Sequence, residues 1–161
     1  MMRAATVLIV VAMLASAAFA EVRTSKAGAV SVDIPSAWKV EANKNEVLAA
    51  ESADKSVGLM FWVVDKSDAK EAIKLLDKAL EGKVTAAKWG KPAEANINGM
   101  KGIKNIGTAK VAGKDAFVML AIVGPTPTKK GVIVFGAIEQ SKLNEHKAEL
   151  SNIFDSLKPV K

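Results

Sequence analysis

The sequence predicts an α+β protein with a mostly antiparallel β-sheet and helices packed on both of its faces. Residues 57–64 and 116–123 are apolar almost without interruption. Such runs are typical of strands that are covered on both faces. Two other segments carry apolar residues at helical spacing, and these can supply the covering layers.

The N-terminus has the three parts of a secretory signal peptide. Arg3 gives a positive start, residues 4–15 form an apolar run, and Ala18-Phe19-Ala20 is an A-x-A-like cleavage site. The run is shorter than the roughly 20 residues that a stable membrane span needs. We therefore expect residues 1–20 to be removed by cleavage after Ala20. Residues 21–161 are expected to form one domain, without a transmembrane anchor, in the periplasm or secreted.

Composition excludes several functions. The chain has no cysteine, so disulfides, thiolate catalysis and thiolate metal ligands are unavailable. The formal net charge is +6, but Arg23 is the only arginine beyond the signal, and lysines alternate with Asp and Glu. Arginine supplies the bidentate contacts of nucleic-acid recognition, so we expect no nucleic-acid partner. Weak attraction to an anionic membrane or cell-wall polymer stays open.

The first half of the chain predicts strands and then a helix. Residues 30–34 alternate apolar and polar, Pro35 ends that strand, and Trp38 follows in a turn. Strands at 46–51 and 57–64 come next. Ser67 can cap a helix that starts at Asp68 and stops at Gly82. Its apolar stripe consists of Ala72, Ile73, Leu76, Ala79 and Leu80. The stretch 84–92 fits neither pattern clearly.

The second half predicts hairpins and a closing helix. Asn98-Gly99 is a two-residue hairpin signal, and Ala112-Gly113 connects strands at 102–111 and 116–123. The loop 124–128 leads to a last strand at 131–138. Ser141 opens the final helix, and Pro159 ends the fold. The buried stripe of that helix consists of Leu143, Leu150, Ile153, Phe154 and Leu157.

Two short elements carry a resemblance to a known family. They are Ile34-Pro35-x-x-Trp38 and the ending Phe154-Asp155-Ser156-Leu157-Lys158-Pro159, separated by the strand, helix and hairpins above. With this order, most of residues 28–160 resembles the PsbP-like α/β/α superfamily. That group includes the photosystem oxygen-evolving accessory protein, a Ran-binding nuclear import factor and small exported bacterial proteins of unknown role. The resemblance implies a fold and no shared chemistry, and no metal-binding residue of the family can be placed here.

No pattern in the sequence predicts catalysis, a cofactor or a metal site. His146 is the only histidine, whereas zinc sites use three or four ligands and a serine triad needs a histidine beside its nucleophile. Residues 107–115 resemble a phosphate-binding loop, but they have five residues between the glycines and Asp115 where Ser or Thr belongs. The pairs Asp65/Asp68 and Glu51/Asp54 suit a helix start and a loop better than glycoside chemistry. His146 is expected at the edge of the helix stripe.

Aromatic and Met residues leave two interpretations. Trp38, Trp62, Trp89, Met60, Met100 and Met119 can line an apolar ligand pocket, but such residues more often fill the core. The neighbours of Trp89 suggest a loop, where an exposed tryptophan marks a contact surface. Lys129 and Lys130 follow a proline-rich loop that serves either recognition or, as we prefer, a stiffened hairpin connection.

These observations favour a non-catalytic, exported binding or accessory module. The expected partner is another protein or a cell-envelope component, contacted through Trp89, Lys129 and Lys130. One alternative is a carrier of a small apolar or lipid-like ligand between sheet and helices. A second alternative is a hydrolase that uses carboxylates.

Overall fold

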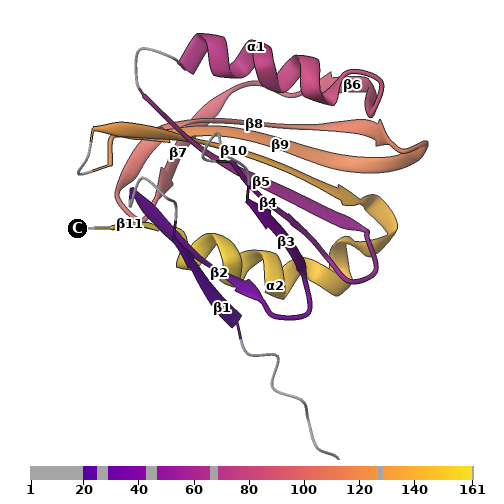
Figure 1. Cartoon of the computed structure of the whole chain (residues 1–161). Coiled ribbons are helices and arrows are strands. Elements are labelled where there is room, and N and C mark those ends of the chain that lie inside the picture. The colour runs from indigo at the N-terminus through magenta and orange to yellow at the C-terminus, as the bar shows by residue number, and fades with distance from the viewer. Residues whose placement is uncertain (1–19, 25–28, 43–46, 66–68, 127–128, 161) are drawn as a thin grey trace, which may run out of the picture.

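Two β-sheets and two α-helices form the described part of the chain (Figure 1). The computed structural model describes residues 20–24, 29–42, 47–65, 69–126 and 129–160. In chain order the elements are β1 (Ala20–Thr24), β2 (Val30–Pro35), β3 (Lys39–Ala42), β4 (Val47–Glu51), β5 (Val57–Asp65), α1 (Ala69–Leu80), β6 (Val84–Trp89), β7 (Ala93–Ile97), β8 (Met100–Val111), β9 (Lys114–Gly124), β10 (Lys130–Glu139), a 3-10 turn (Gln140–Lys142), α2 (Leu143–Ser156) and β11 (Lys158–Pro159).

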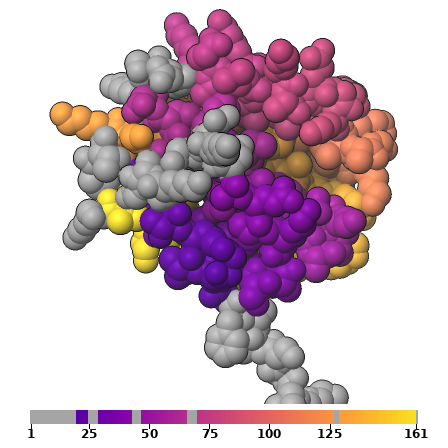
Figure 2. Space-filling model, viewed as in Figure 1, coloured from indigo at the N-terminus to yellow at the C-terminus, as the bar shows by residue number. Residues whose placement is uncertain are grey.

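Every strand pair in the two sheets is antiparallel. The larger sheet has the order β3-β4-β5-β10-β9-β8-β6, with β7 also paired to β8, and the smaller sheet has the order β1-β2-β11. The prediction of a mostly antiparallel α+β fold with two helices is therefore confirmed. Figure 2 shows one face of the molecule, with α1 in magenta above the indigo and purple residues of the first strands.

The central strands divide their side chains between two apolar clusters because successive residues point to opposite faces of a sheet. On β5, Val57, Leu59 and Phe61 belong to the cluster that contains Ile153 of α2 and Leu157, the residue that follows the helix. Met60 and Trp62 lie instead against the cluster that contains Ala72 and Leu76 of α1. Figure 1 shows the two helices on opposite sides of the larger sheet. We call these two sides the α2 side and the α1 side.

Two tight turns set the register of the outer strands. Asn98 and Gly99 have φ of 48° and 88°, and Ala112 and Gly113 have φ of 49° and 81°. Two successive positive φ angles suit the twist of a two-residue hairpin, which is why Asn-Gly is favoured there. The Asn98 side chain also donates hydrogen bonds to the carbonyl oxygens of Asp155 (2.8 Å) and Leu157 (2.7 Å). The turn is thereby attached to the end of α2.

Some elements differ from the sequence-based expectation. The strands β1, β3 and β11 were not predicted, and the ambiguous stretch 84–92 contributes the strand β6. Trp89 ends β6 and does not lie in a loop, because it pairs with Gly107 of β8. The final helix begins at Leu143, after a 3-10 turn that includes Ser141.

The proposed signal peptide, up to residue 19, and the predicted Ser67 cap lie outside the described residues. Within the described ranges, neither helix combines the length and the apolar character needed to cross a bilayer.

Candidate functional site

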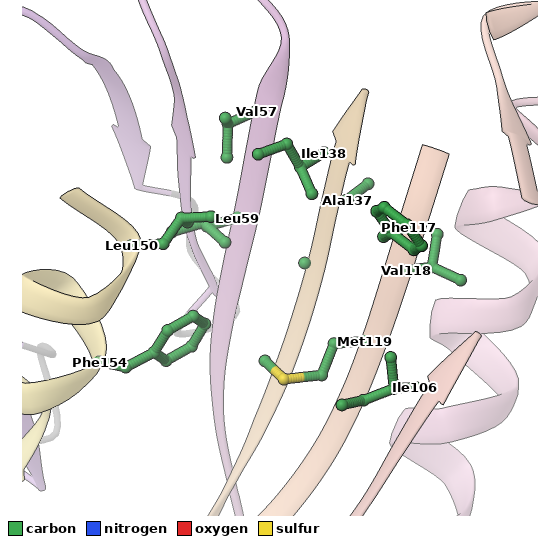
Figure 3. Close-up of a pocket in the computed structure, with 11 residues that line it drawn as sticks. Val57, Leu59, Ile106, Phe117, Val118, Met119, Ala137, Ile138, Leu150 and Phe154 are labelled. Atoms are coloured by element: carbon green, nitrogen blue, oxygen red, sulfur yellow. The ribbon is translucent and has the colours of Figure 1, made fainter. Parts of the chain in front are cut away.

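An apolar groove lies on the α2 side, between α2 and the strands β8 and β9 (Figure 3). It has a volume of about 140 Å³ and opens to the surface. Figure 3 shows Leu150 and Phe154 reaching from α2 toward the sheet, with Phe117 and Met119 of β9 on the far side. The lining residues are Val57, Leu59, Ile106, Phe117, Val118, Met119, Gly136, Ala137, Ile138, Leu150 and Phe154. This lining contains no charged side chain, so the groove is suited to an apolar group.

A glycine in the middle of β10 leaves room for the groove. Gly136 lies between Val134 and Ile138, whose side chains belong to the α2-side cluster. A Cβ at Gly136 would point to that side and would meet only the Leu59 Cδ2 atom, at 3.1 Å. A residue with a side chain at this position would therefore occupy the groove. Because glycine has none, the space between Leu59 and the neighbouring strands stays open.

The outer wall of the groove is exposed to solvent. Ile106 on β8 pairs with Met119 and is 52% exposed. On α2, Leu150 and Phe154 are four residues apart, so they lie one above the other on the same helix face. Both are partly buried. The groove therefore exposes apolar side chains from three elements at one place.

A polar cluster ties α2 to the loop between β4 and β5. His146 Nε2 lies 3.0 Å from Asp54 Oδ2, and His146 Nδ1 lies 2.7 Å from Glu149 Oε2. The Trp38 ring meets the imidazole edge to face, with ring centroids 6.4 Å apart. The His146 side chain is only 14% exposed, so it is at the edge of the helix stripe as expected.

Asp54 is held ionised by several donors. The Ser52 hydroxyl donates to Asp54 Oδ1 at 2.6 Å, and the Ser56 hydroxyl and amide donate to the same atom at 2.8 Å and 3.1 Å. The hydrogen bonds from Ser52, His146 and Ser56 hold the pKa of Asp54 far below its usual value. In return, the hydrogen bond to Asp54 raises the pKa of His146, with a further contribution from Glu149 and an opposing effect of burial.

This cluster suits a structural tie better than catalysis. A histidine with a carboxylate at each ring nitrogen is stabilised as an imidazolium, which donates twice. That form has no lone pair for a substrate proton or a metal ion. Asp54 and Glu149 also contact opposite ring nitrogens and do not converge on one point. Among the residues that the structure describes, no three His, Asp or Glu side chains are placed to hold a metal.

The residues predicted to bind a partner lie at separate places. Trp89 is 42% exposed and lines a hollow with Asp77 and Leu80 of α1. Lys129 and Lys130 line another hollow at the β9–β10 connection, and Lys130 Nζ lies 3.9 Å from Asp65 Oδ1. Their role in binding stays a prediction.

The strand register shows how far apart these residues lie. Trp89 pairs with Gly107 of β8, Gly107 pairs with Val118 of β9, and Val118 pairs with Ala137. Trp89 therefore lies level with Ala137 of β10. Lys130 precedes Ala137 by seven residues on that strand. At about 3.3 Å per residue, this corresponds to about 23 Å along the strands. The structure therefore does not bring Trp89 and the two lysines onto one surface, and none of the three lines the groove.

Sequence reasoning did not find the groove or the Asp54–His146 contact. Leu150 and Phe154 have the spacing of core residues, and nothing in that spacing shows that the sheet extends beyond the helix. The only local signal was Gly136, an isolated glycine inside a strand, where close approach or a missing side chain is common. Met119 was included among the candidate pocket residues, and it does line the groove. Asp54 and His146 are 92 residues apart, so only the fold joins them.

Neither family models nor curated proteins match this chain. Solved structures do. The cyanobacterial PsbP (CyanoP) of Synechocystis sp. PCC 6803 has a TM-score of 0.57 at 10% identity, and the match covers 88% of this chain and 93% of that one. LpqN of Mycobacterium tuberculosis, described as involved in cell envelope biogenesis, has a TM-score of 0.53 at 12% identity, covering 82% and 83%.

A third similar structure comes from a eukaryote. The Ran-binding protein Mog1p of Saccharomyces cerevisiae has a TM-score of 0.52 at 11% identity, and the match covers 88% of this chain and 96% of that one. At such identities the likeness establishes the fold and not the activity. The expected resemblance is thereby confirmed at the level of the fold: this chain has the fold of the PsbP-like superfamily.

Proposed function

We propose that this protein is an exported, non-catalytic binding or accessory module whose contact site is the groove beside α2, and that its partner is another protein. The observation that carries the proposal is an apolar groove that opens to solvent next to a 52% exposed isoleucine, Ile106. Binding sites are typically concave and lined mainly by apolar side chains, as this groove is. The proposal takes α1 and α2 as the layers on the two faces of the sheet, with α2 leaving part of its face uncovered.

The structural neighbours support this class of function. One is a Ran-binding protein, and another is described as involved in cell envelope biogenesis. The alternative of a carboxylate hydrolase has less support, because Asp54 and Glu149 are both committed to His146.

The proposed cleavage after Ala20 is compatible with the first strand. β1 starts at Ala20, and Glu21 to Thr24 pair with β2. Cleavage after Ala20 would leave those four residues free to keep their pairing. The test is the intact mass of the protein recovered from the envelope or periplasmic fraction. A mass that begins at Glu21 supports export, and a mass that includes residues 1–20 contradicts cleavage.

Site-specific photocrosslinking tests the contact surface. A photoreactive phenylalanine analogue at Ile106 should give a discrete protein adduct in cells. The matched control is the same analogue at Leu75, which is 50% exposed on α1 and far from the groove. An adduct at Ile106 and none at Leu75 supports the proposal. Equal adducts at both positions, or none at either, would contradict it.

The carrier of an apolar ligand is the second candidate, because the groove lining is apolar. A cavity of about 150 Å³ lined by apolar side chains can hold a benzene-sized molecule. The groove, at about 140 Å³, has room for one such group. A long acyl chain would leave most of its length in solvent. Native mass spectrometry of the protein from its envelope fraction distinguishes the candidates, because a carrier should retain a small molecule of defined mass.

A further inference from the structure

Three lysines surround the groove from its two walls. Lys104 lies two residues before Ile106 on β8, so both side chains point to the α2 side. Lys88 of β6 pairs with Thr108, which lies two residues after Ile106. On the other wall, Lys147 precedes Leu150 by three residues on α2 and therefore lies on the same helix face. We call Lys88, Lys104 and Lys147 the lysine collar.

The collar is not neutralised by its neighbours. Within the described part of the chain, no ion pair includes Lys88, Lys104 or Lys147.

The nearby carboxylates already have partners. Asp115 Oδ1 lies 3.0 Å from Lys110 Nζ, and Glu145 Oε2 lies 2.8 Å from Lys142 Nζ. Glu149 contacts His146. Asp155 has no ion pair, but it follows Phe154 by one residue and so points about 100° away from it around the helix. The surroundings of the groove therefore carry uncompensated positive charge.

We infer that the groove binds one large apolar side chain from an acidic segment of the partner protein. This inference rests on the proposed function. The groove volume matches one aromatic or branched side chain, and positive charge on both walls matches acidic residues on both sides of that side chain. An anionic amphiphile has its charge at one end, so it would meet the lysines of one wall only. A protein segment therefore fits the collar better than a lipid does.

Capped synthetic peptides provide the first probe. The sequence Asp-Glu-Phe-Glu-Asp should shift the methyl resonance of Met119 in the purified protein. Replacing the Phe of the peptide by Ala should weaken binding at least tenfold, and so should replacing its four acidic residues by lysine. Raising the salt concentration from 50 mM to 500 mM should also weaken binding, since exposed charges are screened. Equal binding of all three peptides, or no Met119 shift with the first peptide, would overturn the inference.

Variants of the groove floor give a matched pair. Gly136→Val fills the groove and should reduce affinity for the acidic peptide at least tenfold. Gly58→Val is the control, because Gly58 is on the adjacent strand β5, pairs with Ala137 and thus projects to the α1 side, where a Cβ meets nothing within 4 Å. Circular dichroism establishes that both variants fold. If Gly136→Val folds and binds as wild type does, the groove is not the site.

Charge reversal provides an independent test that leaves the core unchanged. The pair Lys104→Glu/Lys147→Glu should weaken binding at least tenfold, whereas Lys70→Glu/Lys78→Glu on α1 should change it less than twofold. Similar losses of affinity in both double variants would mean that the peptide responds to the net charge of the protein and not to the lysine collar, and would overturn the inference.

A last probe separates this inference from the proposed function. If dodecanoate shifts Met119 and the acidic peptide does not, the groove binds hydrocarbon and the inference fails. A protein adduct at Ile106 in the crosslinking experiment would then still support the proposed function. Failure of both experiments would overturn both.

Discussion

The two helices of this protein are attached to the sheet in different ways. Near the C-terminal end of α2, Ile153 and the residue that follows the helix, Leu157, are both fully buried. Polar contacts from distant segments also attach it: His146 to Asp54, and the Asn98 side chain to the carbonyl groups of residues 155 and 157. Among the described residues, no side chain of α1 forms a hydrogen bond or ion pair with another element. In this part of the chain, the contacts that place α1 on the sheet are those of Ala72 and Leu76 with the α1-side cluster.

This difference has a physical consequence. Apolar contact is non-directional, whereas a hydrogen bond requires a particular distance and angle. Hollows of about 390 Å³ and 430 Å³ flank the C-terminal half of α1. α2, in contrast, is fixed near both of its ends. The wall of the groove therefore comes from the helix whose position is better defined, as a binding site requires.

Deleting the buried anchor of α2 should have the largest effect. Ile153→Ala removes a side chain that is 1% exposed, and we expect unfolding free energy to fall by about 2–5 kcal/mol. Leu75→Ala on α1, where the side chain is 50% exposed, should lower it by about 0.5 kcal/mol or less. Urea denaturation measures both. A loss at Ile153→Ala no larger than that at Leu75→Ala would mean that the buried Ile153 side chain does not anchor α2.

The Asn98 contact to α2 should have the next largest effect. Asn98→Gly keeps a residue that accepts the φ of 48° but removes two hydrogen bonds, so stability should fall by about 1–3 kcal/mol. Ala112→Gly is the matched control, because Ala112 has a φ of 49° in the equivalent turn. There the substitution relieves strain and should not destabilise. A loss of stability in both variants would mean that the added backbone freedom of glycine, and not the missing hydrogen bonds, causes the effect.

The contact between His146 and Asp54 should make stability depend on pH. The raised pKa of His146 stabilises the fold fully below its ordinary value of 6.5, and this contribution is lost as pH rises through the raised pKa. The lowered pKa of Asp54 acts in the other direction, so its contribution is present above 3.8 and is lost as pH falls through the lowered pKa. The contact between His146 and Asp54 therefore stabilises the fold most between pH 3.8 and pH 6.5.

Chemical denaturation at pH 6 and pH 8.5 measures the histidine contribution. Wild type should be more stable at pH 6. His146→Phe keeps a ring against Trp38 and should remove most of this difference. A pH dependence that survives the substitution would mean that other groups produce it.

The smallest effect is expected on the exposed surface of α1. Lys74 Nζ and Glu71 Oε2 are 3.7 Å apart, and both side chains are largely exposed. Glu71→Gln should lower stability by about 0.5 kcal/mol or less, since solvent screens such pairs. Glu149→Gln, which changes a 2.7 Å contact to a mostly buried imidazole, should have the larger effect at pH 6. The reverse order would contradict the comparison between the two helices.

Local patterns were enough to predict the main elements. The apolar run at 57–64 became β5 because strands covered on both faces need no alternation, and the Asn98-Gly99 turn formed where two positive φ angles were required. The short strands β1, β3 and β11 were missed because four of the five residues in β1 are exposed and the other two strands are too brief to show a period. Trp89 was placed in a loop because its neighbours are Lys and Gly, but pairing with Gly107 extends β6 to include it.

The sequence by itself determined the helix stripes, the central strands and the hairpin turns, because each depends on residues that are close together along the chain. Only the tertiary structure decided which part of the sheet α2 covers. The uncovered part leaves Ile106 exposed and contains the groove at Gly136. The tertiary structure also decided that His146 meets Asp54, 92 residues away. A groove is a place that side chains leave unfilled, and periodicity within single elements cannot reveal it, because it depends on how several elements meet in space.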